Sequence, residues 1–298
     1  MSDQNISKYY SYLLLEKSLS KNTIENYMRD LNKLLEYLAD SKIDYKVVEL
    51  EHLRDFLIDL ADIGIQARSQ ARIISGIKSF YKFLQYDKII ESDPTELLEM
   101  PKTGRHLPEI LDEKEINSIV AAIDMSKPDG QRNRAIIETL YGSGLRVSEL
   151  TNLKLSKINF EEEYMIVEGK GSKQRLAPIS EVQCEQIKLW LMDRNQLTIK
   201  KGNEDFLFLN KFGSKLSRVM IFMIIKQLAE LSGIRKTISP HTFRHSFASH
   251  LLENGANLRA IQQLLGHESI LTTEIYIHTD MSFLRETVLE YHPRNKLS

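Results

Sequence analysis

Apolar residues recur at helical spacing along most of the chain. Between residues 23 and 38 they stand three to four positions apart, which predicts a helix with one buried face. Comparable patterns predict helices over residues 67–85, 181–195, 217–231, 240–254 and 258–265. Residues 164–168 and 175–179 are predicted as short strands, joined in a hairpin by the turn-forming residues 169–173 (GKGSK). We therefore expect a mainly α protein with one small β-hairpin.

A proline-rich stretch interrupts this helical pattern between residues 93 and 108. It contains Pro94, Pro101, Gly104 and Pro108. Prolines remove amide donors and force extended backbone on the residues before them, so the stretch is a linker candidate. The sequence thus predicts an N-terminal domain over residues 1–100 and a second domain over residues 108–298.

The predicted helix over residues 67–85 has two unlike faces. One face is an apolar stripe, and the other carries cations and hydroxyls from Arg68, Arg72, Ser75, Ser79 and Lys82. Such a polar face suits a helix laid against DNA phosphates. A solvated outer face on an ordinary helical bundle gives the same pattern, so the sequence alone leaves both interpretations open.

Composition permits DNA binding without demonstrating it. The 298 residues carry a formal net charge of −1, whereas nucleic-acid binders often have a basic excess. Exposed charges act only over a Debye length of about 8 Å, so local sums matter more. Residues 66–88 contain five basic residues against one acid, and residues 169–175 contain three against none.

Two further features concern the cellular compartment. No apolar run approaches the roughly 18 residues needed to span a membrane, and the early apolar patch over residues 9–15 lacks the features of a signal peptide. The single cysteine, Cys184, excludes an internal disulfide. We expect a cytoplasmic protein.

Residues 141–150 (YGSGLRVSEL) form the first cluster of candidate catalytic residues. We expect the two glycines to open a helix whose first turn presents Arg146, with Glu149 three residues later on the same face. A guanidinium at a helix start suits a phosphate. The plainer alternative is a surface ion pair between Arg146 and Glu149, worth only about 0.3–0.5 kcal/mol.

Residues 239–247 (SPHTFRHSF) form the second cluster. Ser239 is a natural N-cap, and Pro240 suits the first helical position. His241 and Arg244 then share one face near the helix N-terminus, where an anion is favoured.

A metal site and a buried histidine both compete with that interpretation. His241 and His245 are four residues apart, the spacing of two zinc ligands on a helix. The residue after His241 is Thr242, so the glutamate of the metalloprotease signature is missing, and no third ligand is evident. We therefore expect no metal, and packing of His241 beside core aromatic residues is the stronger alternative.

The third cluster combines LLGHES at residues 264–269 with TTEIYIH at residues 272–278. Gly266 is the expected helix terminator, and Tyr276 follows His267 by nine residues. The chain has 12 tyrosines, so only the neighbouring motifs distinguish Tyr276 from the others. No G-x-S-x-G elbow or phosphate-binding loop is present, and Cys184 has no neighbouring histidine, so other nucleophiles and ATP are not indicated.

In this order and at these distances, the clusters resemble the tyrosine recombinase (phage-integrase-like) family, and within it the bacterial XerC/XerD group. The resemblance covers nearly the whole chain, and the chain end at residues 291–294 (YHPR) is most like the XerD members. It rests on GSGLRVSEL (142–150), GKGSK (169–173), HTFRHSF (241–247), HLLENGA (250–256) and LGH (265–267) with the tyrosine that follows.

The resemblance implies a helical, SAM-like core-binding domain followed by an α-rich catalytic domain. It also implies cleavage through a 3′-phosphotyrosine with no metal or nucleotide cofactor. Tyr276 would be the nucleophile, Lys170 the general acid and Glu149 the residue that orients Arg146 or its helix. The implied catalytic set is Arg146, Lys170, His241, Arg244, His267 and Tyr276. Glu274 stands where glutamine is common in the family. This departure bears on the fine tuning of the cleavage rate and not on the assignment to the family.

The implied partner is double-stranded DNA with a dif-type site, enclosed by the two domains as a clamp. Lys173 and Arg175 join the residues of the 67–85 helix as expected DNA contacts. Four protomers would assemble, alone or with an XerC-like recombinase, and a DNA translocase of the FtsK type is a further partner that the resemblance implies. The C-terminal segment would dock on a neighbour or pack within its own chain, through Phe283, Leu284, Val288 and Leu289.

Three alternatives to this function remain at the level of sequence. A mobile-element integrase would use the same chemistry on a different DNA site. A DNA-binding scaffold without activity would not need the six catalytic residues. A metal-dependent hydrolase would lose activity with a chelator.

Overall fold

The computed structural model describes residues 4–101, 109–169, 174–266 and 274–295, and for residues 274–282 it describes the backbone alone. The chain divides into two compact units, Met1–His106 and Leu107–Ser298, hereafter the N-terminal and C-terminal units. The predicted linker overlaps this division. No helix among the described residues is long and apolar enough to cross a membrane.

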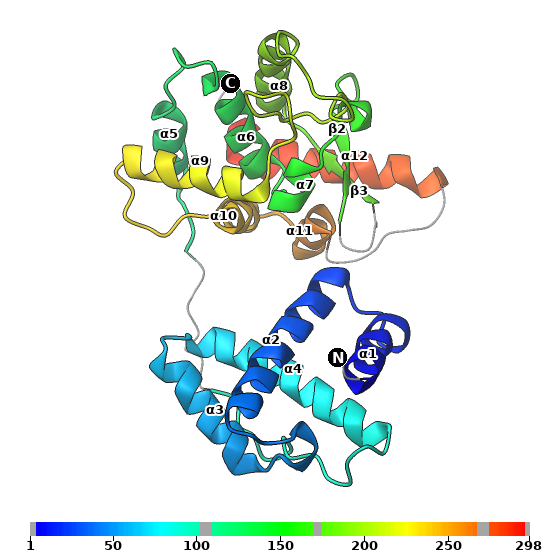
Figure 1. The fold of residues 1–298 in the computed structure, drawn as a ribbon. Coiled ribbons are helices and arrows are strands. Elements are labelled where there is room, and N and C mark those ends of the chain that lie inside the picture. Colours follow the sequence, from blue (N-terminus) through cyan, green and yellow to red (C-terminus); the bar gives the residue numbers. More distant parts are fainter. Residues whose placement is uncertain (1–3, 102–108, 170–173, 267–273, 296–298) are drawn as a thin grey trace. The chain divides into compact units, whose positions relative to one another are not determined.

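The N-terminal unit is entirely helical in its described part (Figure 1). Its long helices α2 and α4 pack together, and their predicted apolar stripes are buried in its core. The predicted helices over residues 23–38 and 67–85 are thereby confirmed. The elements are α1 (Gln4–Ser11), a π-helical turn (Tyr12–Glu16), α2 (Lys21–Asp40), a 3-10 turn (Tyr45–Val47), α3 (Leu50–Asp62) and α4 (Ala67–Tyr86).

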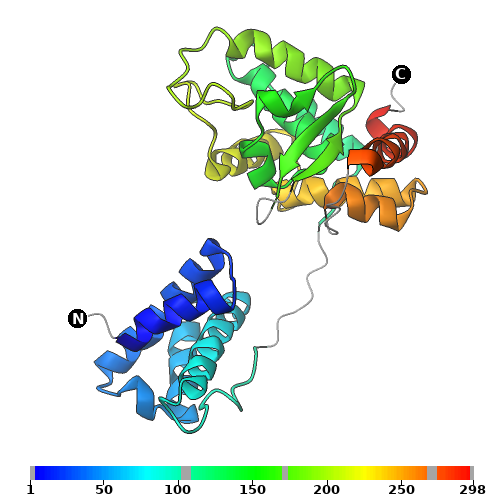
Figure 2. The same cartoon turned by 90° about the vertical axis from the view of Figure 1, so that its right-hand side faces the viewer.

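The C-terminal unit combines a small sheet with several helices (Figures 1 and 2). Its helices are α5 (Glu113–Ala121), α6 (Gly130–Gly142), α7 (Val147–Thr151), α8 (Glu181–Arg194), α9 (Arg218–Leu231), α10 (Pro240–Glu253), α11 (Leu258–Leu265) and α12 (Glu274–Tyr291), with 3-10 turns at Leu155–Lys157 and Pro293–Asn295. The helices predicted for this region are confirmed to within a residue or two. The mainly α fold class is confirmed as well.

The sheet has three antiparallel strands in the order β1-β2-β3, where the sequence predicted two. The strands are β1 (Ile158–Asn159), β2 (Tyr164–Glu168) and β3 (Gln174–Pro178). The predicted hairpin is β2–β3, and its register pairs Val167 with Arg175. Strand β1 has two residues, which is too short for any periodicity to reveal it.

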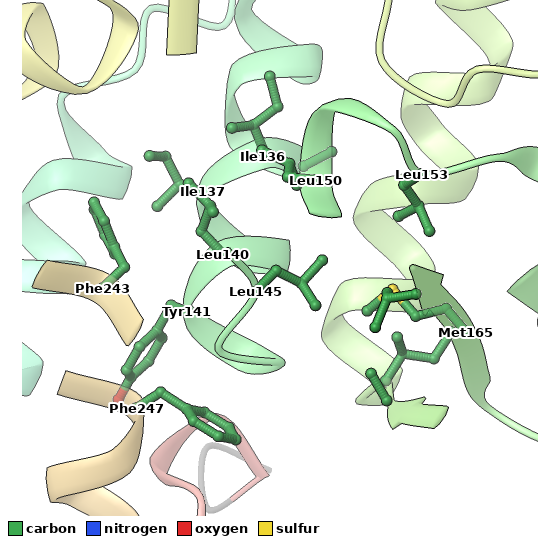
Figure 3. Packing of buried hydrophobic residues seen from close by; sticks show 14 of the residues in the cluster. Ile136, Ile137, Leu140, Tyr141, Leu145, Leu150, Leu153, Met165, Phe243 and Phe247 are labelled. Atoms are coloured by element: carbon green, nitrogen blue, oxygen red, sulfur yellow. The ribbon is translucent and has the colours of Figure 1, made fainter. Parts of the chain in front are cut away.

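The core of the C-terminal unit lies around α6 and α10. Tyr141, Leu145, Phe243 and Phe247 are almost completely buried there (Figure 3). Because Arg244 stands between two of these aromatic anchors on α10, its backbone position is fixed by the core. The core therefore sets where this arginine enters the polar site described below.

Residues 283–295 pack within the C-terminal unit. Leu284 and Val288 of α12 are buried in the core, whereas Phe283 and Leu289 remain exposed. Beyond α12, His292 and Arg294 are buried, and Arg294 donates to Glu138 of α6 through Nε at 2.9 Å. Two of the four expected anchors thus serve intramolecular packing.

Candidate active site

The joint between α6 and α7 places Arg146. Gly142 is the last residue of α6, not the start of the next helix as the sequence suggested. Gly144 then takes a left-handed backbone conformation (φ 55°), which a residue without a side chain adopts at little cost. The helix α7 begins one residue after Arg146, so this arginine is its N-cap.

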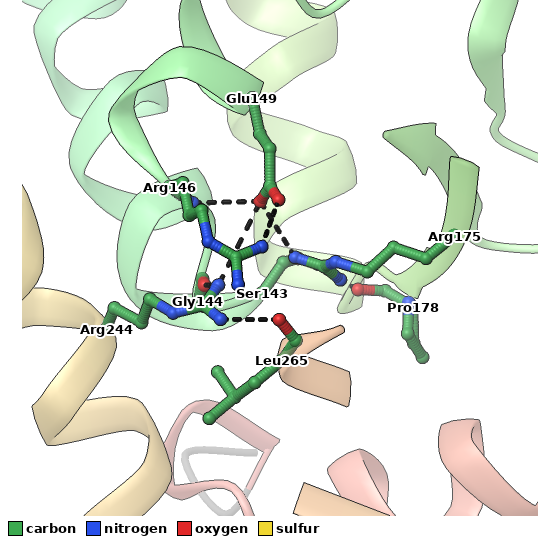
Figure 4. A network of polar contacts seen from close by, with 8 residues as sticks. All are labelled: Ser143, Gly144, Arg146, Glu149, Arg175, Pro178, Arg244 and Leu265. Carbon is green, nitrogen blue, oxygen red and sulfur yellow. Dashed lines mark hydrogen bonds and ion pairs between the residues drawn. The ribbon is translucent and has the colours of Figure 1, made fainter. Parts of the chain in front are cut away.

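Glu149 is the centre of a buried polar network (Figure 4). Its carboxylate is completely buried and accepts hydrogen bonds from the backbone N–H of Arg146 at 2.9 Å and from Arg146 Nη1 at 2.8 Å. Arg175 of β3 donates to the same carboxylate through Nη2 at 2.9 Å. The alternative of a weak surface pair between Arg146 and Glu149 is therefore wrong.

Arg244 reaches the same network from α10. Its Nη1 donates to the carbonyl of Gly144 at 2.8 Å and lies 4.0 Å from the Glu149 carboxylate. Its Nη2 donates to the carbonyl of Leu265, the last residue of α11. Three guanidinium groups thus meet one carboxylate, and two of them belong to arginines that the sequence predicted as catalytic.

The charges of this network shift the pKa values of its members. Burial alone would raise the pKa of Glu149, but Arg175 and Arg146 outweigh it and leave the pKa lowered, so the carboxylate is ionised. Burial, with Arg146 and Arg175 nearby, lowers the pKa of Arg244 to about 10. Three cations around one anion leave an excess positive charge, and Arg146, with its side chain 33% exposed, is the most accessible of them. Such a site attracts a phosphate.

His241 lies at the start of α10, as predicted. The backbone N–H of Ser239 donates to the Thr242 hydroxyl at 3.1 Å, and Pro240 occupies the first turn. His241 is exposed, so the alternative that it packs beside the core aromatic residues is wrong. Partial loss of hydration, together with electrostatic repulsion from His245, Arg244 and Arg146, lowers its pKa. Among the described residues, no group of three potential ligands is placed to hold a metal.

The remaining predicted catalytic residues lie at the limits of the described structure. Lys170, Lys173 and His267 lie outside the described residues. Tyr276 belongs to the first turn of α12, of which only the backbone is described there. Gly266 has φ 67° and ends α11 directly before His267, which confirms the predicted helix terminator.

The expected DNA-facing stripe of α4 divides into two groups. Arg68 and Lys82 are exposed, and Ser79 is half-buried. Arg72 instead forms an ion pair with the buried Asp30 of α2, and the Ser75 hydroxyl donates to its own helix at the carbonyl of Ala71. Helical periodicity could not reveal the Asp30 contact, because it joins two helices.

Arg175 is the residue whose place in this network the sequence interpretation missed. Its side chain is only 13% exposed, although the sequence suggested an outward DNA contact. A signal was available in the strand pattern, since Arg175 shares its face of β3 with Ala177, which is buried. The alternation of side chains along a strand therefore predicts that Arg175 faces the interior.

Comparisons with known proteins agree across both units. Residues 109–282 match the phage integrase family, and residues 6–88 match the phage integrase N-terminal SAM-like domain. Tyrosine recombinase XerD of Staphylococcus epidermidis (strain RP62A) is 40% identical over 290 residues, covering 97% of this chain and 98% of that protein. Tyrosine recombinase XerD of Staphylococcus aureus (strain N315) has the same identity and coverage.

A solved structure shares the fold. The XerH site-specific recombinase bound to a palindromic difH substrate has a TM-score of 0.71 at 24% identity, covering 97% of this chain and 89% of that one. The sequence resemblance to this family is confirmed. The chain belongs to the phage integrase family of tyrosine recombinases, enzymes that break and rejoin DNA.

Proposed function

We propose that this recombinase cleaves DNA with Tyr276 as the nucleophile and Arg146, Arg244, His241 and His267 as ligands of the scissile phosphate. The observation that supports this most directly is the convergence of Arg146 and Arg244 on Glu149. The two arginines lie about 100 residues apart in the sequence, and the hydrogen bond from Arg244 to the Gly144 carbonyl helps to bring them together. An excess of positive charge around one buried carboxylate suits a phosphate whose charge grows during reaction.

The chemistry follows from the charge balance at phosphorus. A tyrosine has an unperturbed pKa of about 10, so its phenol must pass a proton to water as it attacks, and a cationic site favours that loss. The attack forms the bond from phenol oxygen to phosphorus and breaks the bond from phosphorus to the 5′ oxygen. Lys170 would give a proton to this leaving oxygen, in the role of general acid. The 3′-phosphotyrosine keeps the phosphodiester energy, and a 5′ hydroxyl from a partner duplex reverses the step.

The proposed substrate is a dif-type site, where recombination would resolve chromosome dimers during cell division. The similarity to XerD proteins over nearly the whole chain supports this assignment. The active assembly would be a tetramer on two DNA sites in the cytoplasm, with itself or with an XerC-like recombinase. A translocase of the FtsK type would act as its regulator.

The nucleophile can be tested with a nicked suicide substrate, whose short 5′ fragment diffuses away after cleavage. The protein, in buffer with EDTA, should form a covalent adduct with the strand that ends in the 3′ phosphate, and Tyr276→Phe should abolish it. Tyr86→Phe is the control, because Tyr86 is a highly exposed tyrosine of the N-terminal unit. An adduct that persists in Tyr276→Phe would refute the assignment.

A further inference from the structure

Arg175 holds an unusual position for a basic residue beside a DNA site. It lies on β3, and its side chain runs inward from the strand to Glu149, with only 13% of its surface exposed. Its Nε and Nη1 atoms are buried and have no hydrogen-bond partner among the described residues. A buried guanidinium loses much of its hydration, so its charge must be compensated nearby. Glu149 supplies that compensation.

The end of α11 also bears on Arg175. A side chain at Gly266 would place its Cβ 2.7 Å from Arg175 Cδ and 3.1 Å from Nε. A side chain at Gly266 would therefore displace the arginine from its path to Glu149, and the φ of 67° also favours glycine there. Gly266 directly precedes His267, a candidate ligand of the phosphate. Arg175 therefore lies beside Gly266 and also binds Glu149, the carboxylate that holds Arg146.

Arg175 and Arg244 both approach one oxygen of Glu149, Oε2. Arg175 Nη2 donates to Oε2 at 2.9 Å, while Arg244 Nη1 lies 4.0 Å from that same atom and is bonded to the carbonyl of Gly144. Oε2 also accepts the backbone N–H of Arg146 at 2.9 Å, so Arg175 supplies its one side-chain hydrogen bond among the described residues. In a buried site, attraction between opposite charges is strong, and a carboxylate whose charge is poorly compensated is costly. Without Arg175, that oxygen would draw Arg244 or Arg146 toward it and away from a phosphate.

We propose that Arg175 is a positioning residue that occupies Glu149 Oε2 and so keeps Arg146 and Arg244 free to bind the scissile phosphate. The inference rests on the proposed function and adds to it a residue that acts through Glu149, without contact to DNA. It differs from the expectation from sequence, in which Arg175 contacts DNA.

A double-mutant cycle tests this inference. The rate constant of adduct formation is measured at saturating protein for wild type, Arg175→Gln, Glu149→Gln and the double variant. Arg175→Gln should lower the rate constant on the order of 10–100-fold, the usual effect of misplacing catalytic groups. In the Glu149→Gln background the same change should cost less than about threefold, because the carboxylate that Arg175 neutralises is gone. Arg175→Lys, which keeps a positive charge beside Glu149, should recover much of the loss and covers the case in which Arg175→Gln does not fold.

A direct contact with DNA predicts a different result. Arg175→Gln would then weaken binding to uncleaved DNA and reduce the salt dependence of that binding, and its penalty would be equal in both Glu149 backgrounds. That pattern would overturn the inference. For the positioning role, binding to uncleaved DNA should change by no more than about threefold.

Arg132 offers a matched control. It is another buried arginine of the C-terminal unit, paired with Asp129 at 3.1 Å and bonded to the carbonyl of Leu209. Arg132→Gln should lower the melting temperature and leave the rate constant of the folded protein unchanged. If wild type forms no adduct that depends on Tyr276, the proposed function fails. If wild type forms it and folded Arg175→Gln reacts at the same rate, only the role of Arg175 fails.

Discussion

Arg72 forms an ion pair that ties two helices of the N-terminal unit together. Its partner Asp30 is completely buried on α2, and the second carboxylate oxygen, Oδ1, has no partner among the described residues. The arginine side chain is itself 38% exposed. At the scale of single residues, Arg72 is thus primarily the counter-charge of Asp30, whereas Arg68 projects from the same helix into solvent.

Arg72→Met should therefore destabilise the protein by about 2–3 kcal/mol, because it leaves a buried carboxylate without a counter-charge. The free energy of unfolding can be measured by urea titration. Arg68→Met is the control and should change that free energy by less than about 0.5 kcal/mol. Adding Asp30→Asn to Arg72→Met should recover more than half of the loss. A loss of stability no larger than that of Arg68→Met would contradict this account.

The sequence predicted which arginines matter at the candidate site better than it predicted their partners. Arg146 and Arg244 stand beside helix starts, a local feature that residue order reveals. The contact of Arg175 with Glu149 spans 26 residues and depends on how β3 packs against α7. Such contacts follow from tertiary packing, which periodicity does not encode, and the same holds for Arg72 and Asp30.

At the scale of elements, Gly144 is the joint where α6, α7 and α10 meet. A Cβ on Gly144 would lie 2.5 Å from Cδ1 of the buried Phe247, and the Gly144 carbonyl accepts the hydrogen bond of Arg244. The glycine is thus required for two reasons, its left-handed backbone and the close approach of α10. The sequence marked this glycine-rich segment as a helix boundary but could not identify which glycine makes the turn.

Gly144→Ala should cost about 2–4 kcal/mol of stability, the sum of left-handed strain and overpacking against Phe247. Gly233, which follows α9, is the matched control, since its φ is 72° and a Cβ there would meet nothing within 4 Å. Gly233→Ala should therefore cost only about 1–2 kcal/mol, from backbone strain alone. Equal losses of stability in the two variants would show that contact with Phe247 does not matter.

The helices were predictable because each buries one face. In α4, for example, Ile73, Ile77, Phe80 and Leu84 are all completely buried, as their spacing requires. Strand β1 escaped prediction because it is held by pairing with β2 and by no pattern of its own. Elements defined by their own amphipathic pattern are visible in sequence, whereas elements defined by a neighbour are not.

At the scale of the whole molecule, the two units have hydrophobic cores with no residue in common. The single tryptophan of the chain, Trp190, is buried in the core of the C-terminal unit. Its fluorescence therefore reports on unfolding of that unit alone, whereas circular dichroism reports on the helices of both. This difference allows a property of one unit to be measured in the intact chain.

His292 gives the C-terminal unit a dependence on acid. The ring is fully buried, with Tyr141 and Phe247 as aromatic neighbours, and burial together with Arg294 and His250 lowers its pKa from 6.5 to about 3. Since the folded state holds this histidine neutral, the unfolded state binds its proton first as the pH falls below 6.5. Stability supplied by the neutral ring is thus complete above that pH and decreases toward the folded pKa.

Between pH 7.5 and 5.5, this one group should remove about 1.4 kcal/mol from the free energy of unfolding reported by Trp190 fluorescence. His292→Asn cannot titrate, so its loss over the same range should be smaller by that amount. Comparison with the variant also cancels the contribution of Glu138, whose raised pKa from burial acts in the opposite direction. Equal pH dependence in wild type and His292→Asn would mean that the buried ring does not control the acid response. Because His292 directly follows α12 and is fully buried, its acid response would report how firmly this segment is held in the C-terminal unit.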